Sequence, residues 1–425
     1  MTSRFRRLLL DTAPLRLDRD YRWLWSGQVV NGIGTQITRL ALPFQVYTLT
    51  GSTLAIAALT AFQLVPLLVF ALGAGSLADA VDRRRLLMAT QSGLALCSLA
   101  LLLLSLTGDP PLAALFAVAA VAAGLSAVDQ PARGSSIPRL VPPVRLPAAL
   151  ALNQLNFQAG SIIGPAIAGV LLATVGLSGA YLVDVLTFVA SLAALWVIRP
   201  LPPMAGARRP GLAAIREGLR FARQRPPIFG SFVIDLVAMI FAMPTALFPA
   251  LALDVFRVGP TGLGLLASAP ALGAFVAALL SGWLSRVVRV GLGVVSSVLV
   301  WAAAISAFGL ATVVLGAAAF PIALATLAVA GAADMYSAVL RSTIMQLGTP
   351  DTLRGRVTSI HTLVVVSGPR VGDIQMSVVA AAVGPPLAVL AGGLACLVGI
   401  GLVVRALPGF VGHTLDRSTA DAPGA

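Results

Sequence analysis

Long apolar stretches recur along almost the whole sequence, and they constrain its fold more than any other feature. A helix that crosses a bilayer needs about 20 mostly apolar residues, because each residue rises about 1.5 Å across roughly 30 Å of hydrocarbon. The sequence predicts twelve such spans, at 22–48, 53–78, 86–107, 111–132, 147–173, 178–198, 227–253, 260–284, 290–309, 312–338, 356–381 and 386–406. Only 11% of the residues are charged, against about 25% in a soluble domain. We therefore predict an all-α membrane protein.

The basic residues fall on one side of the predicted membrane. All 29 are arginine, and all but Arg39, Arg257 and Arg370 lie near the termini or in the loops that would share their side. This is the positive-inside pattern, and it predicts that both termini are cytoplasmic. It also accounts for the net charge of +13 without a nucleic-acid partner. The first 20 residues hold no apolar segment with a cleavage site, so no signal peptide is expected.

Part of the chain repeats at an offset of 207 residues, which predicts two related halves. Gly124, Ser135, Ile137, Leu140 and Pro143 match Gly331, Ser342, Ile344, Leu347 and Pro350. Each set lies at the end of the fourth span in a group of six. We expect a six-helix half at 1–198, a cytoplasmic linker with an amphipathic helix at 199–226, a second six-helix half at 227–410 and a disordered tail at 411–425. Two six-span halves in this order are the architecture of the major facilitator fold.

The motif that closes the second span carries the most specific resemblance. Gly75-Ser-Leu-Ala-Asp79-Ala-Val-Asp82-Arg83-Arg84-Arg85 resembles the G-x-L-A-D-x-x-G-R-R/K motif of the major facilitator superfamily. The resemblance implies that Gly75, Asp79, Arg83 and Arg84 take part in gating. A glycine permits close helix approach, and Asp79 is placed to cap the third span or to pair with an arginine. Asp82 replaces the family's glycine, and a plain basic loop is the alternative interpretation.

A glycine–proline motif lies in the fifth span, at Gly160-Ser-Ile-Ile-Gly164-Pro165-Ala-Ile-Ala-Gly169. It is similar to the motif in the fifth helix of proton-driven exporters of the superfamily. Pro165 removes a backbone hydrogen bond and kinks the helix, and Gly164 leaves room for a neighbouring helix. We expect both residues to act in gating, with ordinary helix packing as the alternative.

Further stretches resemble the branch of the superfamily that contains the enterobactin exporter and the macrolide efflux proteins. They are Asp129-Gln-Pro131-Ala-Arg133, Pro138–Pro142, Asp351–Val357 and Gly368–Asp373. The resemblance covers about residues 15–410. It implies a multi-pass monomer of the bacterial plasma (inner) membrane that exports a small amphipathic molecule by alternating access and takes up protons in return. A catecholate-type siderophore is favoured as substrate. Efflux of macrolides or other drugs is one alternative, and a membrane sensor or assembly protein without transport is another.

Ionisable residues inside the predicted spans are candidates for function, because each costs at least about 2.5–3.5 kcal/mol to insert. Arg370 and Asp373 lie three residues apart in span eleven, so they share a helix face and can pair. Together with Asp235 in span seven, they are the predicted proton-coupling residues, and a static ion pair is the alternative. Asp235 has no obvious local partner, and pairing with Arg39 or Arg370 is an alternative role for it. Asp184 is expected to reach water near the outer face.

Polar side chains in three spans mark a predicted substrate path. They are Gln28, Asn31, Thr35 and Arg39 in span one, Gln63 in span two, and Asn153 and Asn156 in span five. Hydrogen bonding between helices is the alternative role for about half of them. The sequence has no phosphate-binding loop, no metal-ligand cluster and no Ser-His-Asp arrangement. An enzyme, a cofactor and a metal are therefore not expected, and the predicted partners are the substrate, protons and the lipid bilayer.

Overall fold

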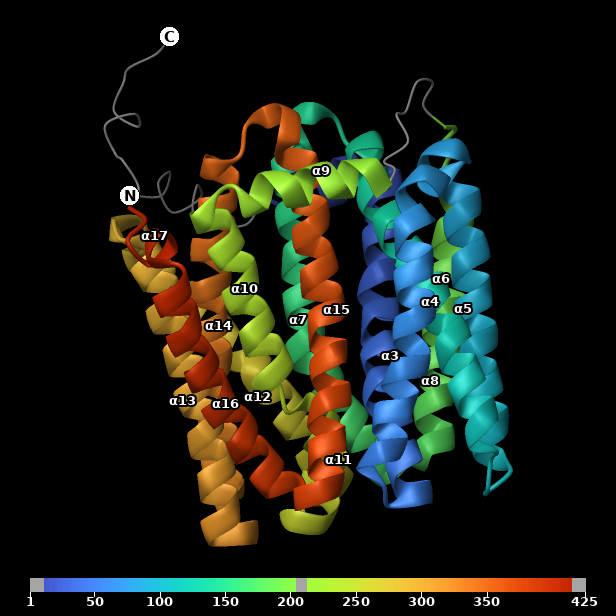
Figure 1. Ribbon diagram of the computed structural model, residues 1–425. Helices are drawn as coiled ribbons and strands as arrows, with labels where there is room; N and C mark the ends of the chain where they lie inside the picture. Colours follow the sequence, from blue (N-terminus) through green and yellow to red (C-terminus); the bar gives the residue numbers. More distant parts are fainter. Residues whose placement is uncertain (1–10, 204–211, 415–425) are drawn as a thin grey trace, which may run out of the picture. The chain divides into compact units, whose positions relative to one another are not determined.

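The computed structural model describes residues 11–203 and 212–414 (Figure 1). These residues contain twelve long helices. They are α3 (Arg19–Thr50), α4 (Thr53–Ala80), α5 (Arg83–Leu106), α6 (Leu112–Leu140), α7 (Leu146–Thr174), α8 (Gly176–Val197), α10 (Pro226–Phe241) with its continuation to Val255, α12 (Gly259–Leu279), α13 (Val290–Leu315), α14 (Phe320–Gly348), α15 (Asp351–Val383) and α16 (Pro385–Ala406). Short helices precede, connect or follow them: α2 (Ala13–Leu17), η1 (Pro143–Arg145), α9 (Leu212–Arg223), η4 (Ser281–Arg286), η5 (Gly316–Ala319) and α17 (Pro408–Val411).

The composition of these helices suits a bilayer. Ten stretches of the described residues are long and apolar enough to span it, and one of them, Val290–Gly348, contains both α13 and α14. The remaining helix, α3, falls short because of its polar residues between Gln28 and Arg39. Large aliphatic side chains are exposed along the bundle, such as Leu279 (71%) and Leu106 (66%). Their exposure is stable in lipid, which is as apolar as the side chains themselves.

The chain folds as two units that repeat the same helix pairings. Residues 1–51, 58–210 and 259–268 form the first unit, and 52–57, 211–258 and 269–425 form the second. In the first unit α3 packs on α7 and α8, and α5 packs on α6 and α8. In the second unit α10 packs on α15 and α16, and α13 packs on α14 and α16. Each pairing in one unit has its counterpart six spans later, as the sequence repeat predicts. This is the major facilitator fold with two pseudo-symmetric halves.

The repeated glycines occupy equivalent packing positions. A Cβ added to Gly124 of α6 would lie 2.9 Å from the ring of Phe70 and 3.5 Å from Pro66, both on α4. A Cβ added to Gly331 of α14 would lie 1.9 Å from the carbonyl oxygen of Pro270 on α12. In both units, therefore, the fourth span needs a glycine where it meets a proline of the second span.

Glycine also forms the turns at one end of each unit. Six glycines of the described chain have φ between 54° and 86°: Gly51, Gly108, Gly176, Gly259, Gly316 and Gly384. Each follows an odd-numbered span and precedes the next span, where a left-handed residue ends a helix at little cost. The connections at the opposite end are rich in arginine instead, as in Arg83-Arg84-Arg85 and between Arg286 and Arg289.

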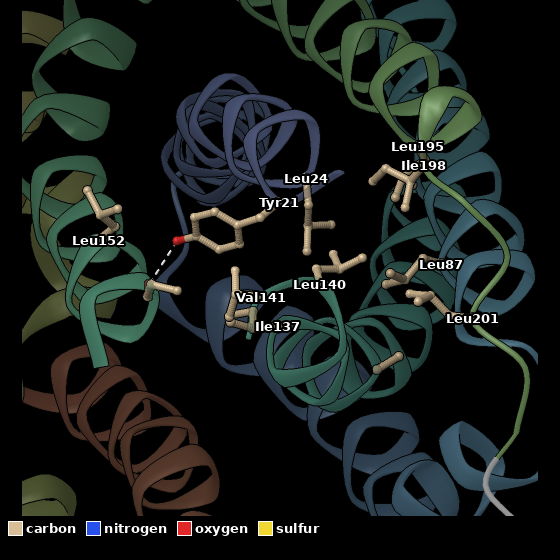
Figure 2. Close-up of a cluster of buried hydrophobic side chains, with 12 residues drawn as sticks. Tyr21, Leu24, Leu87, Ile137, Leu140, Val141, Leu152, Leu195, Ile198 and Leu201 are labelled. Carbon is tan, nitrogen blue, oxygen red and sulfur yellow. Dashed lines mark hydrogen bonds between the residues drawn. The ribbon is translucent and has the colours of Figure 1, made fainter. Parts of the chain in front are cut away.

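A buried apolar cluster holds the arginine-rich end of the first unit together (Figure 2). Its members come from α3, α5, α6, α7 and α8 and the loops that follow, and include Tyr21, Leu24, Leu87, Ile137 and Leu195. Tyr21 is 1% exposed, and its hydroxyl donates to the carbonyl of Ala149 on α7 at 2.8 Å. Next to it, Arg145 binds both carboxylate oxygens of Asp18, at 2.7 and 2.8 Å. The hydrogen-bonded Asp18 carboxylate raises the pKa of Arg145.

Replacing Tyr21 with Phe should lower the free energy of unfolding by about 1 kcal/mol, the net value of a typical hydrogen bond. The apolar ring stays in place, so only the bond to Ala149 is lost. Thermal unfolding in detergent measures the effect. Tyr336→Phe is the matched control, since its hydroxyl forms no hydrogen bond within the described residues and its ring contacts Trp283. Equal melting temperatures of the two variants would contradict the prediction.

The seventh span is interrupted, whereas the sequence predicted one continuous helix over 227–253. α10 ends at Phe241, and after residues 242–244 the chain resumes as η2 (Thr245–Leu247), α11 (Phe248–Ala250) and the π-helix η3 (Leu251–Val255). The break falls at Pro244, which lacks an N–H and disfavours helical conformation in the residue before it. The span therefore consists of two segments.

Two helices extend further than predicted. The predicted spans four and ten end at residues 132 and 338, but α6 continues to Leu140 and α14 to Gly348. Arg133 and Arg341, assigned to cytoplasmic loops from the sequence, therefore lie within helices and are buried, at 8% and 3% exposure. The prediction that they lie in loops is wrong, because each helix continues past its arginine, α6 even through Pro138, and ends only next to Pro142 or Pro350, where the helical conformation is disfavoured in the residue before the proline.

The linker and the end of the chain pack on the second unit. α9 lies across the ends of α10 and α15 (Figure 1), and a Cβ on its Gly218 would lie 3.1 Å from the carbonyl of Arg356. Glu217 also pairs with Arg356. The predicted tail is described to residue 414, where the N–H of Gly291 donates to the carbonyl of His413 at 3.2 Å. Residues 204–211 of the predicted linker and 415–425 of the predicted tail lie outside the described chain.

Candidate functional site

Asp373 binds the interrupted span of the second unit. From α15, its Oδ1 accepts hydrogen bonds from Thr245 Oγ1 at 2.6 Å and from the backbone N–H of Ala246 at 3.1 Å. These groups open the short segment that follows the break, so the carboxylate acts as the cap that this segment lacks in its own sequence. Asp373 therefore joins α15 to the point where span seven is discontinuous.

Arg370 lies one turn before Asp373 on α15 and is half-buried. It acts on Asp373 as a nearby positive charge, while the hydrogen bonds described for the carboxylate come from Thr245 and Ala246. The two residues thus share a helix face, as their spacing implies. The additional partner on span seven was not predicted, because it depends on the break at Pro244.

Asp235 forms a buried ion pair with Arg341. Asp235 on α10 and Arg341 on α14 have side chains that are 2% and 4% exposed, and Arg341 also lies 3.7 Å from the exposed Asp334. The sequence suggested Arg39 or Arg370 as the partner of Asp235. That suggestion is wrong because α14 continues almost three turns beyond its predicted end, so that Arg341 lies on the helix and is buried.

The Asp235–Arg341 pair is incompletely hydrogen-bonded. Within the described chain, Asp235 Oδ2, Arg341 Nε and the hydroxyl of Ser337 are buried without a hydrogen-bond partner. Ser337 precedes Arg341 by one turn on α14. A buried ion pair stabilises a protein only when its geometry and its remaining hydrogen bonds are good. Static stabilisation therefore explains this pair poorly.

In the first unit, Asn31 belongs to a chain of hydrogen bonds across three helices. Its Nδ2 donates to Gln91 Oε1 on α5 at 3.2 Å, and Gln91 Nε2 donates to Asp129 Oδ1 on α6 at 3.0 Å. Thr90 also donates to that oxygen, and Arg133 pairs with Asp129 Oδ2 at 3.1 Å. Asn31 is only 8% exposed. Its contacts correspond to the alternative role of hydrogen bonding between helices.

The other predicted path residues lie on three helices. Gln28 and Thr35 on α3, Gln63 on α4, and Asn153 and Asn156 on α7 are half-buried. Thr35 donates to the carbonyl of Asn31 in its own helix at 2.9 Å, and Asn153 Oδ1 is buried without a partner in the described chain. Arg39 is exposed in the middle of α3. A substrate path through these residues stays a prediction.

Asp184 is buried, whereas the sequence suggested that it reaches water. It is 1% exposed, and its Oδ2 accepts hydrogen bonds from Thr38 on α3 and Ser98 on α5. Asp184 lies eight residues into α8, which is about 12 Å along the helix axis. That depth and the packing of α3 and α5 against α8 remove it from solvent.

The predicted gating arginines bind within the first unit. Arg83 donates to the carbonyl of Ser135 at 2.9 Å, and Arg84 donates to the carbonyls of Leu195 and Trp196 at the end of α8. The residue that caps α5 is Asp82, whose Oδ1 accepts from the N–H of Arg85 at 3.0 Å. The sequence placed Asp79 either to cap this helix or to pair with an arginine. Gly75 and Asp79 fall within α4, but the surroundings of both residues lie outside the described structure.

Gly164 and Pro165 lie at close helix contacts of the first unit. A Cβ on Gly164 would lie 2.5 Å from Cβ of Gln36, so α7 touches α3 at this glycine. The carbonyl of Pro165 lies 2.6 Å from where a Cβ on Gly264 would be, at the start of α12. These contacts agree with the packing interpretation of the motif, and gating stays a prediction.

The described residues contain no group of three or more His, Cys, Asp or Glu side chains arranged to hold a metal. Their charged chemistry consists instead of carboxylates that contact helix ends, hydroxyls or arginines inside the bundle. Such groups can take up or release a proton when their partners move.

Comparison with known proteins gives a consistent result over more than nine-tenths of the chain. The model of the transmembrane secretion effector family matches residues 11–418. An enterobactin exporter of Escherichia coli O1:K1 is 28% identical over 392 residues, which cover 92% of each chain. The enterobactin exporter of Citrobacter koseri is 28% identical over 402 residues, or 94% of each chain. A bacterial homologue of the iron transporter ferroportin, solved in an inward-facing state, shares the fold with a TM-score of 0.74 at 15% identity, over 92% of this chain and 98% of that one.

Proposed function

Since this chain belongs to the transmembrane secretion effector family, we propose that it exports a catecholate-type siderophore in exchange for protons. The chain is a multi-pass membrane transporter of a small molecule and not an enzyme. The observation that carries the finer proposal is its similarity to enterobactin exporters over 92% of both chains. The exporter works as a monomer by alternating access. Its two six-helix halves move against each other, so that the substrate site opens to each side of the membrane in turn.

The contacts of Asp373 support its role in proton coupling. When ionised, this carboxylate accepts two hydrogen bonds at the break of span seven and interacts with the charge of Arg370. Protonation removes the negative charge that strengthens all three interactions. Proton uptake therefore loosens the attachment of α15 to the short segment after the break. Asp235 is the second candidate, since its pairing with Arg341 leaves buried polar atoms unsatisfied.

The arrangement of loops supports the proposed orientation in the plasma (inner) membrane. The connections that carry arginine, including those at Arg83–Arg85 and Arg286–Arg289, face the cytoplasm together with both termini. The turns that contain left-handed glycines then face outward. Gating by Gly75, Asp79, Arg83 and Arg84 at the cytoplasmic end, and by Gly164 and Pro165 in α7, belongs to the same proposal.

The function is tested with purified protein in vesicles across which a pH gradient is imposed. We expect the gradient to drive accumulation of a catecholate siderophore, and Asp373→Asn to reduce that accumulation at least tenfold. The asparagine oxygen still accepts hydrogen bonds from Thr245 and Ala246, so the fold is kept while the titratable charge is lost. Asp109→Asn, at an exposed loop position, is the matched control and should transport like the wild type.

The same assay distinguishes the alternatives. If the vesicles accumulate macrolides and not the siderophore, the protein is a drug exporter of the same fold. Movement of no solute from either panel would favour a sensor or assembly protein. Gradient-driven transport that persists in Asp373→Asn would remove Asp373 from the coupling mechanism.

A further inference from the structure

Asp184 differs from the other buried aspartates of the described chain in having only uncharged partners. Asp129 is paired with Arg133 at 3.1 Å, and Asp235 is paired with Arg341. The described partners of its carboxyl group are the hydroxyls of Thr38 and Ser98. The hydroxyl of Thr187 donates to the backbone carbonyl of Asp184 at 2.7 Å and lies 3.5 Å from Oδ1. No ion pair reaches Asp184 within the described residues. With 1% exposure, it also has no access to water that could solvate a charge.

The packing around this carboxyl group is close on the α3 side. A Cβ on Gly34 would lie 2.0 Å from Thr187 Oγ1 and 2.5 Å from Asp184 Oδ1. The absence of a side chain at Gly34 thus lets α3 approach the carboxyl group directly. Thr38, one turn later on α3, donates to Asp184 Oδ2 at 2.5 Å. The site is therefore formed by α3, α5 and α8 of the first unit.

The hydroxyl partners suit a neutral carboxylic acid as well as a carboxylate. A hydroxyl group both donates and accepts hydrogen bonds, so it can accept the proton of a carboxylic acid or donate to an ionised oxygen. An ionised carboxylate in this position would be a buried charge without a counter-ion, which is costly in a medium of low dielectric. The neutral acid avoids that cost and keeps its hydrogen bonds.

The charged and titratable groups nearby do not supply a counter-ion. On α3, Arg39 follows Thr38, but its side chain is exposed and forms no ion pair with Asp184 in the described structure. On α5, Cys97 precedes Ser98, and on α8, the Tyr181 hydroxyl donates to Gln45. α7, which also packs on α8, carries no titratable residue between Leu146 and Thr174.

We infer that Asp184 is a proton-binding site of the first unit and that it holds its proton in this conformation. It is separate from Asp373, which lies in the second unit and binds backbone and hydroxyl groups at a helix break. Proton binding at Asp184 stands on the geometry of this site alone. Its use in the transport cycle rests on the proposed function. In that cycle, Asp184 would bind a second proton that is exchanged for the substrate.

Infrared spectroscopy of the purified protein tests the site directly. A protonated carboxyl group gives a C=O stretching band that a carboxylate lacks. At neutral pH we expect such a band in the wild type, its loss in Asp184→Asn and its retention in the control Asp109→Asn. The asparagine can accept from Thr38 and Ser98 and donate to Thr187, so the melting temperature should stay near that of the wild type.

A second variant keeps the test decisive where Asp184→Asn does not fold. Thr38→Val removes one hydrogen bond to the carboxyl group, so the band should move to higher frequency without loss of intensity. Absence of the band in the wild type, or a band that neither variant changes, overturns the inference. Loss of the band on addition of sodium would identify a sodium site instead and overturn it equally. Because no substrate is present, these results are independent of the transport assay.

Discussion

Arg341→Met should lower the free energy of unfolding by about 3–5 kcal/mol, the cost of leaving a buried charge without its partner. Asp235 is 1% exposed, and Arg341 is its described ion-pair partner. Asp334, the other acid beside Arg341, is half exposed and can turn toward solvent. The folded fraction after extraction in detergent measures the effect. The control is Arg220→Met on α9, an exposed arginine whose loss should leave this fraction unchanged.

A second substitution separates the stability of the pair from its function. Replacing both partners with apolar residues is often neutral for stability, so Asp235→Leu combined with Arg341→Met should recover most of the folded protein. If Asp235 takes part in proton coupling, the folded double variant no longer responds to a pH gradient. A double variant as unstable as Arg341→Met would show that the pair is not the cause of the loss.

Gly331→Ala should strongly destabilise the second unit, although it adds only one methyl group. The new Cβ would lie 1.9 Å from the carbonyl oxygen of Pro270, and its counterpart on Gly273 would lie 1.8 Å from the carbonyl oxygen of Ala328. In both cases the obstacle is backbone, which no side-chain rotation can remove. α12 and α14 must therefore separate, at a cost of about 1–3 kcal/mol or more.

Gly401→Ala on α16 provides the matched control for this prediction. It also adds a methyl group to a glycine inside a long helix, but no atom lies within 4 Å of the new Cβ. Alanine favours the helix by up to about 1 kcal/mol over glycine, so this variant should be as stable as the wild type or slightly more stable. Similar melting temperatures for Gly331→Ala and Gly401→Ala would contradict the close crossing of α12 and α14.

Hydropathy and glycine positions predict most of the fold, since lipid imposes span lengths that can be counted in a sequence. The errors occur where burial depends on several helices at once. The helix extension that buries Arg341 becomes visible once Pro350, rather than the first charge, is taken as the end of the helix. The break at Pro244 has a sequence signal, but its capping by Asp373 has none, because the cap comes from a helix 127 residues away in sequence.

The candidate sites are predicted less completely than the fold. Asp373, Asp235 and Asp184 stand out as acids in apolar stretches, and a single sequence is sufficient to find them. Their partners are separated by long stretches of chain: Thr38 by 146 residues from Asp184, and Arg341 by 106 from Asp235. Spacing along one helix cannot identify such partners. It predicted Arg370 as the partner of Asp373 and gave Asp235 no local partner.

The polar character of α3 has a consequence for how the protein is made. The ribosome synthesises this helix first among the twelve, although its hydropathy is below that of the other spans. Thr38 meets the carboxyl group of Asp184 only after another 146 residues have been synthesised, which takes roughly 7–30 s at about 5–20 residues per second. During that interval the hydroxyl of Thr38 lacks its partner on α8. We therefore expect α3 to insert stably only after α8 has been synthesised.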